Sequence, residues 1–185
     1  RQNLGLPSEF LPMIQKLIKT ADVVVVGAGL AGLRAATEAR RFGADVLLID
    51  KSLIGISGNS AFAGGGFKTC LPGMDTQIEK QYNTPEGHFQ DTILYGDYMS
   101  EQPLVEAMSS EAPGRVLQLE DVGVENFMSL CTQGTSENGG HDVTQAFAAN
   151  LKTIGVKVMV NTILLEILVE DGVVAGALFF NFFRE

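Results

Sequence analysis

Three closely spaced glycines stand where a short strand-like run gives way to a helix-like segment. Gly27, Gly29 and Gly32 follow residues 22–26 with the spacing G-x-G-x-x-G. In such a turn the first glycine bends the chain out of a strand, the second lets a pyrophosphate approach the backbone, and the third lets the helix pack closely on the strand. The helix N-terminus then offers N–H groups and a positive dipole end to the phosphates. This spacing predicts a dinucleotide site.

A carboxylate stands at the end of the next strand-like run. Asp50 follows residues 45–49, which are mostly apolar. A carboxylate in this place can accept hydrogen bonds from both hydroxyls of an adenosine ribose, and it would repel a 2′-phosphate. NADP is therefore disfavoured, while the glycines and the acid leave FAD and NAD both open.

Small residues fill the segment that comes next, GISGNSAFAGGGF at 55–67. They let the backbone pass close to a large planar ligand, because glycine and its small neighbours leave space beside the chain. Ser57, Asn59 and Ser60 offer hydrogen bonds to a phosphate, a ribitol or a flavin edge. An NAD domain would more often continue directly to its next helix and strand. The segment favours FAD, and a flexible surface loop is the alternative interpretation.

The surrounding pattern predicts the elements that hold this site. We expect a helix at 30–42, ended by Gly43, between strands at 22–26 and 45–49. Strand, helix and strand in this order predict a parallel sheet. A glycine-rich loop is expected at 52–73.

The rest of the chain reads as helices followed by strands. Residues 84–122 look helical in three pieces, with Thr84 and Ser100 as caps. A further helix is expected at 142–154, and the strands after it include a hairpin turn at Asp171-Gly172. The fold class predicted is α/β: a Rossmann-like dinucleotide-binding domain with a parallel sheet and a small β-meander. An amphipathic helix is expected at 8–19.

Composition limits the function classes. The chain of 185 residues has a formal net charge of -9 and scattered basic residues, which argues against nucleic-acid binding. No apolar run approaches the roughly 20 residues of a membrane helix. Cys70 and Cys131 suit reduced, buried thiols, and with His88 and His141 as the only histidines no metal site is expected. We expect His88 to be a surface residue at a helix start.

Four stretches together resemble the flavoprotein subunit of the succinate dehydrogenase/fumarate reductase family, which includes L-aspartate oxidase and the adenylylsulfate reductase α subunit. They are VVVVGAGLAGLRAA, SGNSAFAGGGF, residues 88–124 and residues 140–178. The third discriminates best, because simple FAD-binding folds lack it. The resemblance implies an N-terminal helical extension at 1–21 and an incomplete FAD-binding domain at 22–185. The capping domain of the family is absent from this span, so we expect a fragment.

The resemblance also implies FAD bound in extended form. Each part of the cofactor would meet a different part of the chain. The pyrophosphate would meet Gly27, Ala28, Gly29, Leu30, Ala31 and Gly32, and the adenosine ribose Asp50 and Lys51. The ribitol and isoalloxazine would meet Ser57, Gly58, Asn59, Ser60, Ala63, Gly64, Gly65 and Gly66, and the adenine would meet the backbone near Leu164.

One departure from the family pattern bears on the cofactor link. Membrane-bound succinate dehydrogenases carry a flavin-linked histidine within an Arg-Ser-His-Thr run, and Asn59 stands at its place here. An amide has no nucleophilic imidazole, so we expect non-covalent FAD. The lack of a covalent link favours fumarate reduction, aspartate oxidation or reduction of a sulfur compound. His141 is expected to be a helix-start residue near the FAD.

The expected function is therefore that of an FAD-dependent oxidoreductase subunit of fumarate reductase/succinate dehydrogenase type. It would move a hydride between a small dicarboxylate and FAD, and exchange electrons with an iron–sulfur partner. An L-aspartate oxidase, an adenylylsulfate-reductase-like enzyme and a non-catalytic electron-transfer module are the alternatives. We expect a cytoplasmic protein that meets the membrane only through partners. No catalytic residue is assigned, because all four arginines of the interior lie on predicted helices: Arg34, Arg40, Arg41 and Arg115.

Overall fold

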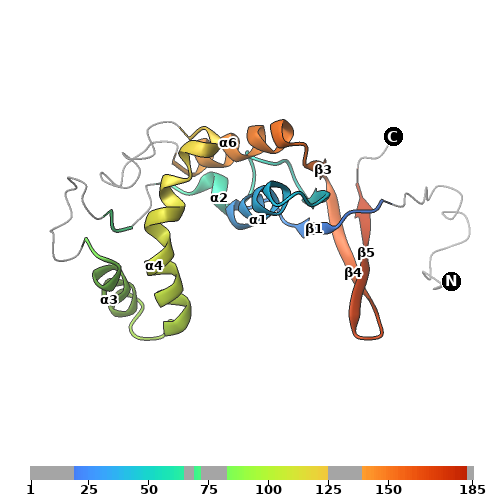
Figure 1. Cartoon of the computed structure of the whole chain (residues 1–185). Coiled ribbons are helices and arrows are strands. Elements are labelled where there is room, and N and C mark those ends of the chain that lie inside the picture. The colour runs from blue at the N-terminus through green and yellow to red at the C-terminus, as the bar shows by residue number, and fades with distance from the viewer. Residues whose placement is uncertain (1–18, 65–68, 72–82, 125–138, 183–185) are drawn as a thin grey trace, which may run out of the picture.

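The computed structural model of the chain describes residues 19–64, 69–71, 83–124 and 139–182 (Figure 1). Most of the expected helix at 8–19 lies outside these residues. The same holds for two of the expected cofactor residues and for one cysteine, namely Gly65, Gly66 and Cys131.

A three-stranded parallel sheet forms the centre of the fold. Its order is β1 (Val23–Val26), β2 (Val46–Ile49), β3 (Lys157–Met159), and both neighbouring pairs are parallel. All four residues of β2 are buried, which explains their uniformly apolar sequence VLLI. The predicted strand–helix–strand unit and its parallel sheet are confirmed.

Two helices pack on this sheet and on each other: α1 (Leu30–Arg41) and α6 (Gly139–Ile154) (Figure 1). Leu33 of α1 and Val143, Phe147 and Leu151 of α6 are almost completely buried in one core cluster. Burying each of these side chains contributes roughly 1.5–3 kcal/mol. Apolar packing between α1 and α6 therefore fixes the position of the helix whose first residues form the site.

Each of these two helices has a glycine at one of its ends. α1 ends at Arg41, and Gly43 follows with a left-handed φ of 90°, as expected of the glycine that ends a helix. α6 begins at Gly139, three residues before the expected start. Glycine is a poor helix former, so propensity alone does not predict helix there.

Three helical pieces follow the cofactor loop, as predicted: α3 (Pro85–Tyr95), α4 (Gln102–Leu117) and the 3-10 helix η2 (Glu120–Val122). The Thr84 hydroxyl caps α3 by accepting from the Gly87 N–H at 3.0 Å. The expected cap at Ser100 is wrong, because Glu101 is the residue before α4 and makes no side-chain cap. Pro113 lies inside α4 and has no N–H to donate to the preceding turn.

The predicted hairpin is β4 (Thr162–Glu170) and β5 (Val173–Asn181), which pair antiparallel. Asp171 and Gly172 both have positive φ, 51° and 78°, which matches the two-residue turn that suits twisted hairpins. Among the described residues, the small meander consists of these two strands. Figure 1 shows the hairpin projecting away from the sheet and helices, and most of its side chains are exposed.

Candidate cofactor site

The glycine turn is shaped by a contact between its own first and last glycines. Gly27 has a φ of 99° and donates its N–H to the Ile49 carbonyl at 2.8 Å, which ties the turn to β2. A Cβ on Gly32 would lie 1.8 Å from the Gly27 carbonyl oxygen. A side chain at position 32 is thus excluded mainly by the Gly27 carbonyl. The packing of the helix on the strand, which the glycine spacing suggested as the reason, matters less.

Asp50 is bound to the turn from the neighbouring strand. Its Oδ2 accepts from the Ala28 N–H at 2.6 Å, and its Oδ1 accepts from the Ser52 N–H at 2.7 Å. The Asp50 backbone is fixed as well, because its N–H donates to the Met159 carbonyl and its carbonyl accepts from Thr162, each at 2.9 Å. Each carboxylate oxygen keeps a second lone pair, so the group can still accept from a ribose.

Ser60 reaches the same turn from the cofactor loop. Its Oγ accepts from the Leu30 N–H, the first of α1, at 3.1 Å. The N-cap residue of α1 is Gly29, which has no side chain to cap the helix. Ser60 itself lies in a short helix, α2 (Asn59–Phe62), inside the segment where a loop was expected. Gly58, with a φ of 80°, starts that helix.

The start of α6 packs against the cofactor loop. The Gly140 N–H donates to the Ala63 carbonyl at 3.0 Å, and a Cβ on Gly140 would lie 2.1 Å from the Ser60 carbonyl oxygen. The buried Thr144 hydroxyl lies 2.9 Å from the Gly55 carbonyl. Sequence reasoning missed Gly140 and Thr144. The glycine pair before the helix was the one available signal.

The structure brings some of the expected site residues together and leaves others apart. Ala28, Leu30, Asp50 and Ser60 meet at the turn. The Ser57 hydroxyl donates to the carbonyl of Leu53, within its own loop. Other expected residues lie apart from the turn's hydrogen bonds: Lys51, Asn59 and Gly64 are exposed, and Leu164 is half-buried in β4. Among the described residues, none of these four makes a side-chain hydrogen bond to the turn.

Open space on one side of the turn fits a dinucleotide. A Cβ built on Gly27, Gly58 or Gly64 would meet no atom within 4 Å. At Gly29, a Cβ would lie 3.4 Å from the Ser60 Oγ. A pyrophosphate can therefore approach the turn at the N–H groups that Ile49, Asp50 and Ser60 do not already bind, as the glycine spacing predicts.

The two histidines and the described cysteine differ in their exposure. His88 is only 5% exposed in the first turn of α3, so the expectation of a surface residue is wrong. Tertiary packing of α3 buries it, which its position near a helix start does not reveal. His141 is exposed in the first turn of α6. Cys70 is buried as predicted, and that burial raises the pKa of its thiol.

Within the described parts of the chain, three or more His, Cys, Asp or Glu side chains never gather in a group that could hold a metal ion. Among the same residues, none of the helices combines the length and hydropathy needed to cross a membrane.

The four interior arginines are all engaged with neighbouring groups. Arg34 donates to the side chain of Gln118 and pairs with Glu38 at 3.1 Å. The other three are bound to backbone carbonyls or to carboxylates. Arg40 donates to the Ile154 and Ala44 carbonyls, Arg41 pairs with Glu38, and Arg115 pairs with Glu111 at 2.9 Å.

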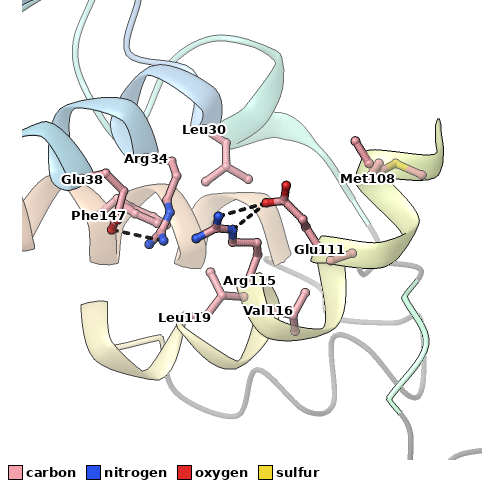
Figure 2. A pocket seen from close by; sticks show the side chains of 11 residues that line it. Leu30, Arg34, Glu38, Met108, Glu111, Arg115, Val116, Leu119 and Phe147 are labelled. Carbon is pink, nitrogen blue, oxygen red and sulfur yellow. Dashed lines mark hydrogen bonds and ion pairs between the residues drawn. The ribbon is translucent and has the colours of Figure 1, made fainter. Parts of the chain in front are cut away.

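A cavity of about 790 Å³ lies between α1, α4 and α6, which we call the α1–α4 groove. Figure 2 shows Arg34 and Arg115 extending into it from α1 and α4, each paired with a glutamate of its own helix. Its other lining is largely apolar: Leu30, Ala107, Met108, Ala112, Val116, Leu119 and Phe147. Only Leu30 belongs to both the groove and the glycine turn.

Comparison with known proteins agrees with this site. The sequence profile of the family described as FAD binding domain matches residues 22–182. Fumarate reductase (cytochrome) of Shewanella frigidimarina is 33% identical over 170 residues, which are 86% of this chain and 29% of that protein. L-aspartate oxidase of Streptomyces coelicolor is 29% identical over 173 residues, or 84% of this chain and 28% of that protein.

Solved structures lead to the same group. The quinol fumarate reductase of E. coli superimposes with a TM-score of 0.69 at 26% identity, covering 87% of this chain and 29% of that one. The chain thus spans less than a third of the length of these relatives. The resemblance to fumarate reductase and succinate dehydrogenase flavoproteins is confirmed. The chain belongs to the FAD binding domain family, and its cofactor is FAD.

Proposed function

We propose that the protein is an FAD-dependent oxidoreductase of fumarate reductase/succinate dehydrogenase type, acting on a small dicarboxylate. The observation that carries this proposal is the glycine turn held from two sides, by Asp50 and by Ser60, in a chain whose relatives include fumarate reductases. Residues 22–185 would be the FAD-binding part of it, with 1–21 as an extension.

Different residues bind different parts of the cofactor. The start of α1, residues 27–32, holds the pyrophosphate, and Asp50 accepts from the adenosine ribose, with Lys51 beside it. The segment 57–66 runs along the ribitol and the flavin, and the backbone near Leu164 approaches the adenine. When bound, FAD supplies a centre that accepts or gives a hydride.

The cofactor is held without a covalent bond. Asn59 is exposed at the start of α2, and its amide offers no nucleophile to the flavin ring. An absorbance spectrum of the purified protein, before and after acid precipitation, tests this. A flavin spectrum released into the supernatant is expected. Flavin retained in the pellet contradicts the role given to Asn59, and a protein that binds nicotinamide dinucleotide in place of flavin contradicts the whole proposal.

The substrate clamp lies outside the described residues. Clamping a dicarboxylate requires cationic groups that can face its carboxylates, preferably bidentately. Arg34, Arg40, Arg41 and Arg115 are already bound to groups of their own fold. We therefore assign no catalytic residue in this span, and place the clamp in the remaining two thirds of a family-length protein.

Two substrates remain to be separated, and relatives favour both. One relative is a fumarate reductase and another is an L-aspartate oxidase. With the full-length protein under anaerobic conditions, reoxidation of chemically reduced flavin by fumarate, with no reduction of the flavin by L-aspartate, supports the first. Bleaching of the oxidised flavin by L-aspartate supports the second. The proposal also includes an iron–sulfur subunit that exchanges electrons with the flavin at the cytoplasmic side of a membrane. Co-purification of the full-length protein with such a subunit tests the association.

A further inference from the structure

We propose that the helix predicted at 8–19 packs on one apolar face of the hairpin formed by β4 and β5. The family profile begins at residue 22 and includes the whole hairpin, so this contact would belong to this chain and not to the family as a whole. It involves neither the cofactor nor the substrate, and its absence would leave the proposed function untouched.

One face of the hairpin is apolar along almost its whole length. Residues that pair across two strands point to the same side of a sheet, so the register of β4 and β5 sorts their side chains into two faces. One of them, which we call the hairpin face, is lined by Leu164, Ile167, Val169, Val174, Ala177 and Phe179. The opposite face carries two charges, at Glu166 and Glu170.

The outer part of the hairpin face is open. Ile167 and Val169 are each 56% exposed, and Val174 is 67% exposed. A hairpin of two strands is only marginally stable in water unless its apolar side chains pack against another element. A contiguous exposed apolar surface of this kind marks a place of contact.

The segment at 8–19 has an apolar stripe that fits such a surface. The first described residue is Lys19, so almost all of this segment lies outside the described part of the chain. Five apolar side chains share one side of the predicted helix: Phe10, Leu11, Ile14, Leu17 and Ile18. A surface helix with a stripe of this width buries it against another element.

Charge favours this segment over a second copy of the hairpin. Residues 1–19 have three basic side chains and one acidic side chain, a net charge of +2: Arg1, Lys16, Lys19 and Glu9. Residues 162–181 have a net charge of -3 and contain neither lysine nor arginine, the acids being Glu166, Glu170 and Asp171. Two hairpins therefore repel each other, whereas the N-terminal segment and the hairpin attract each other.

The predicted helix is long enough to reach the hairpin. The hairpin begins at the parallel sheet, where the Thr162 N–H donates to the Asp50 carbonyl at 2.9 Å. Asp50 follows β2, whose first residue Val46 pairs with Val23, so about 13 Å of strand separates the start of β1 from the hairpin. A helix of residues 8–19 is about 18 Å long and covers that distance. Figure 1 shows the first described residues, in blue, at the same end of the view as the hairpin, in red.

The test is amide hydrogen exchange, followed by mass spectrometry, in the full-length protein loaded with FAD. Val174→Asp places a charge on the hairpin face, and Val173→Asp places the same charge on the opposite face. The two residues are nearly equally exposed, Val173 at 69% and Val174 at 67%, which makes the pair a matched control. We expect Val174→Asp to speed the exchange of residues 8–18 about tenfold, because a lost apolar contact shifts the docking equilibrium by about that factor. Val173→Asp should leave this exchange unchanged.

A reciprocal pair of variants lies in the predicted helix. Ile14→Asp places a charge within the apolar stripe, and Gln15→Asp makes the same change of charge one residue later, outside the stripe. We expect Ile14→Asp to speed the exchange of the β4 and β5 amides about tenfold and to leave that of the β2 amides unchanged. Gln15→Asp should alter neither.

Several outcomes would overturn the contact. One is exchange of residues 8–18 at the rate of an unfolded peptide in the unaltered protein. Another is a hairpin that responds to Val174→Asp but not to Ile14→Asp, because a different part of the protein then covers the face. Slower hairpin exchange at higher protein concentration, with a dimer in sedimentation, assigns the face to a second copy.

An equal response to both members of a pair marks a general loss of stability and also counts against the contact. If Val174→Asp does not fold, Val174→Thr keeps the size of the side chain and adds a hydroxyl. It is measured in the same way, with Val173→Thr as its control. The Ile14 and Gln15 variants leave the hairpin sequence unchanged, so they test the contact in either case.

Discussion

The glycine turn and the α1–α4 groove share Leu30, yet they are organised in opposite ways. At the turn, the N–H groups of Ala28 and Leu30 are bound by side chains from two other segments, and Gly32 leaves no room for a methyl group. Along the groove, Met108 of α4 is 44% exposed, and two ion pairs, Arg34–Glu38 and Arg115–Glu111, belong to the lining. Short backbone contacts fix the turn, whereas the groove tolerates change. Substitutions should therefore separate the two regions by the size of their effects.

The largest effect is expected from Gly32→Ala. Its Cβ would lie 1.8 Å from the Gly27 carbonyl oxygen, so the turn must open to accept it. We expect a loss of about 3 kcal/mol in the free energy of unfolding, as for a severely overpacked site, and a FAD affinity reduced more than about a hundredfold. Urea unfolding and FAD titration measure both. Ala35→Gly, an exposed position of the same helix, should cost about 1 kcal/mol and leave FAD binding intact.

Asp50→Ala should come next. It removes the acceptor of the Ala28 and Ser52 N–H groups together with the predicted ribose contact. Lost hydrogen bonds to a charged acceptor are worth roughly 1.5–3 kcal/mol each, so the FAD affinity should fall by about one to two orders of magnitude. Asp121→Asn changes an exposed carboxylate of η2 and serves as the control. Equal FAD titrations for the two variants would remove Asp50 from the site.

Thr144→Val tests the support beneath the cofactor loop. Valine fills the same space but leaves the Gly55 carbonyl without the hydroxyl that lies 2.9 Å from it. We expect about 1–2 kcal/mol of lost stability and only a severalfold loss of FAD affinity. Thr153→Val, at an exposed threonine of the same helix, should change neither value by more than about 0.5 kcal/mol. A FAD affinity lost as completely as in Gly32→Ala would show that the loop, and not the turn, limits binding.

The smallest effect is expected in the groove, from Met108→Gln. Met108 is 44% exposed and makes none of the hydrogen bonds that fix the glycine turn, so stability should change by less than about 0.5 kcal/mol and FAD affinity not at all. Thermal unfolding and FAD titration of this chain give the comparison. A clear loss of FAD affinity here would break the separation between the two regions.

Sequence reasoning succeeded where structure depends on near neighbours. The spacing of Gly27 and Gly32 and the turn at Asp171-Gly172 follow from local backbone geometry. The ribose contact of Asp50 stays a prediction, and the profile match over 22–182 supports the family. The three helical pieces of 84–122 were marked by their prolines and by Thr84.

The failures share a different cause. Gly140 and Thr144 act on a loop some eighty residues earlier, and the burial of His88 depends on packing between helices. Contacts between segments so far apart in sequence leave no periodic pattern, because each needs only one suitable residue on either side. The α2 helix was missed for the related reason that it is a single turn within a glycine-rich segment.

Pro113 gives α4 a property that hydrogen exchange would reveal. Because proline has no N–H, the Ser109 carbonyl lacks its usual partner four residues on, and the ladder of α4 is interrupted there. The short segment of α4 after the proline leads to Gln118, whose side chain accepts from Arg34 of α1, whereas α3 packs on α4. The segments before and after the proline should therefore open as separate cooperative units, with slower amide exchange in the segment tied to α1.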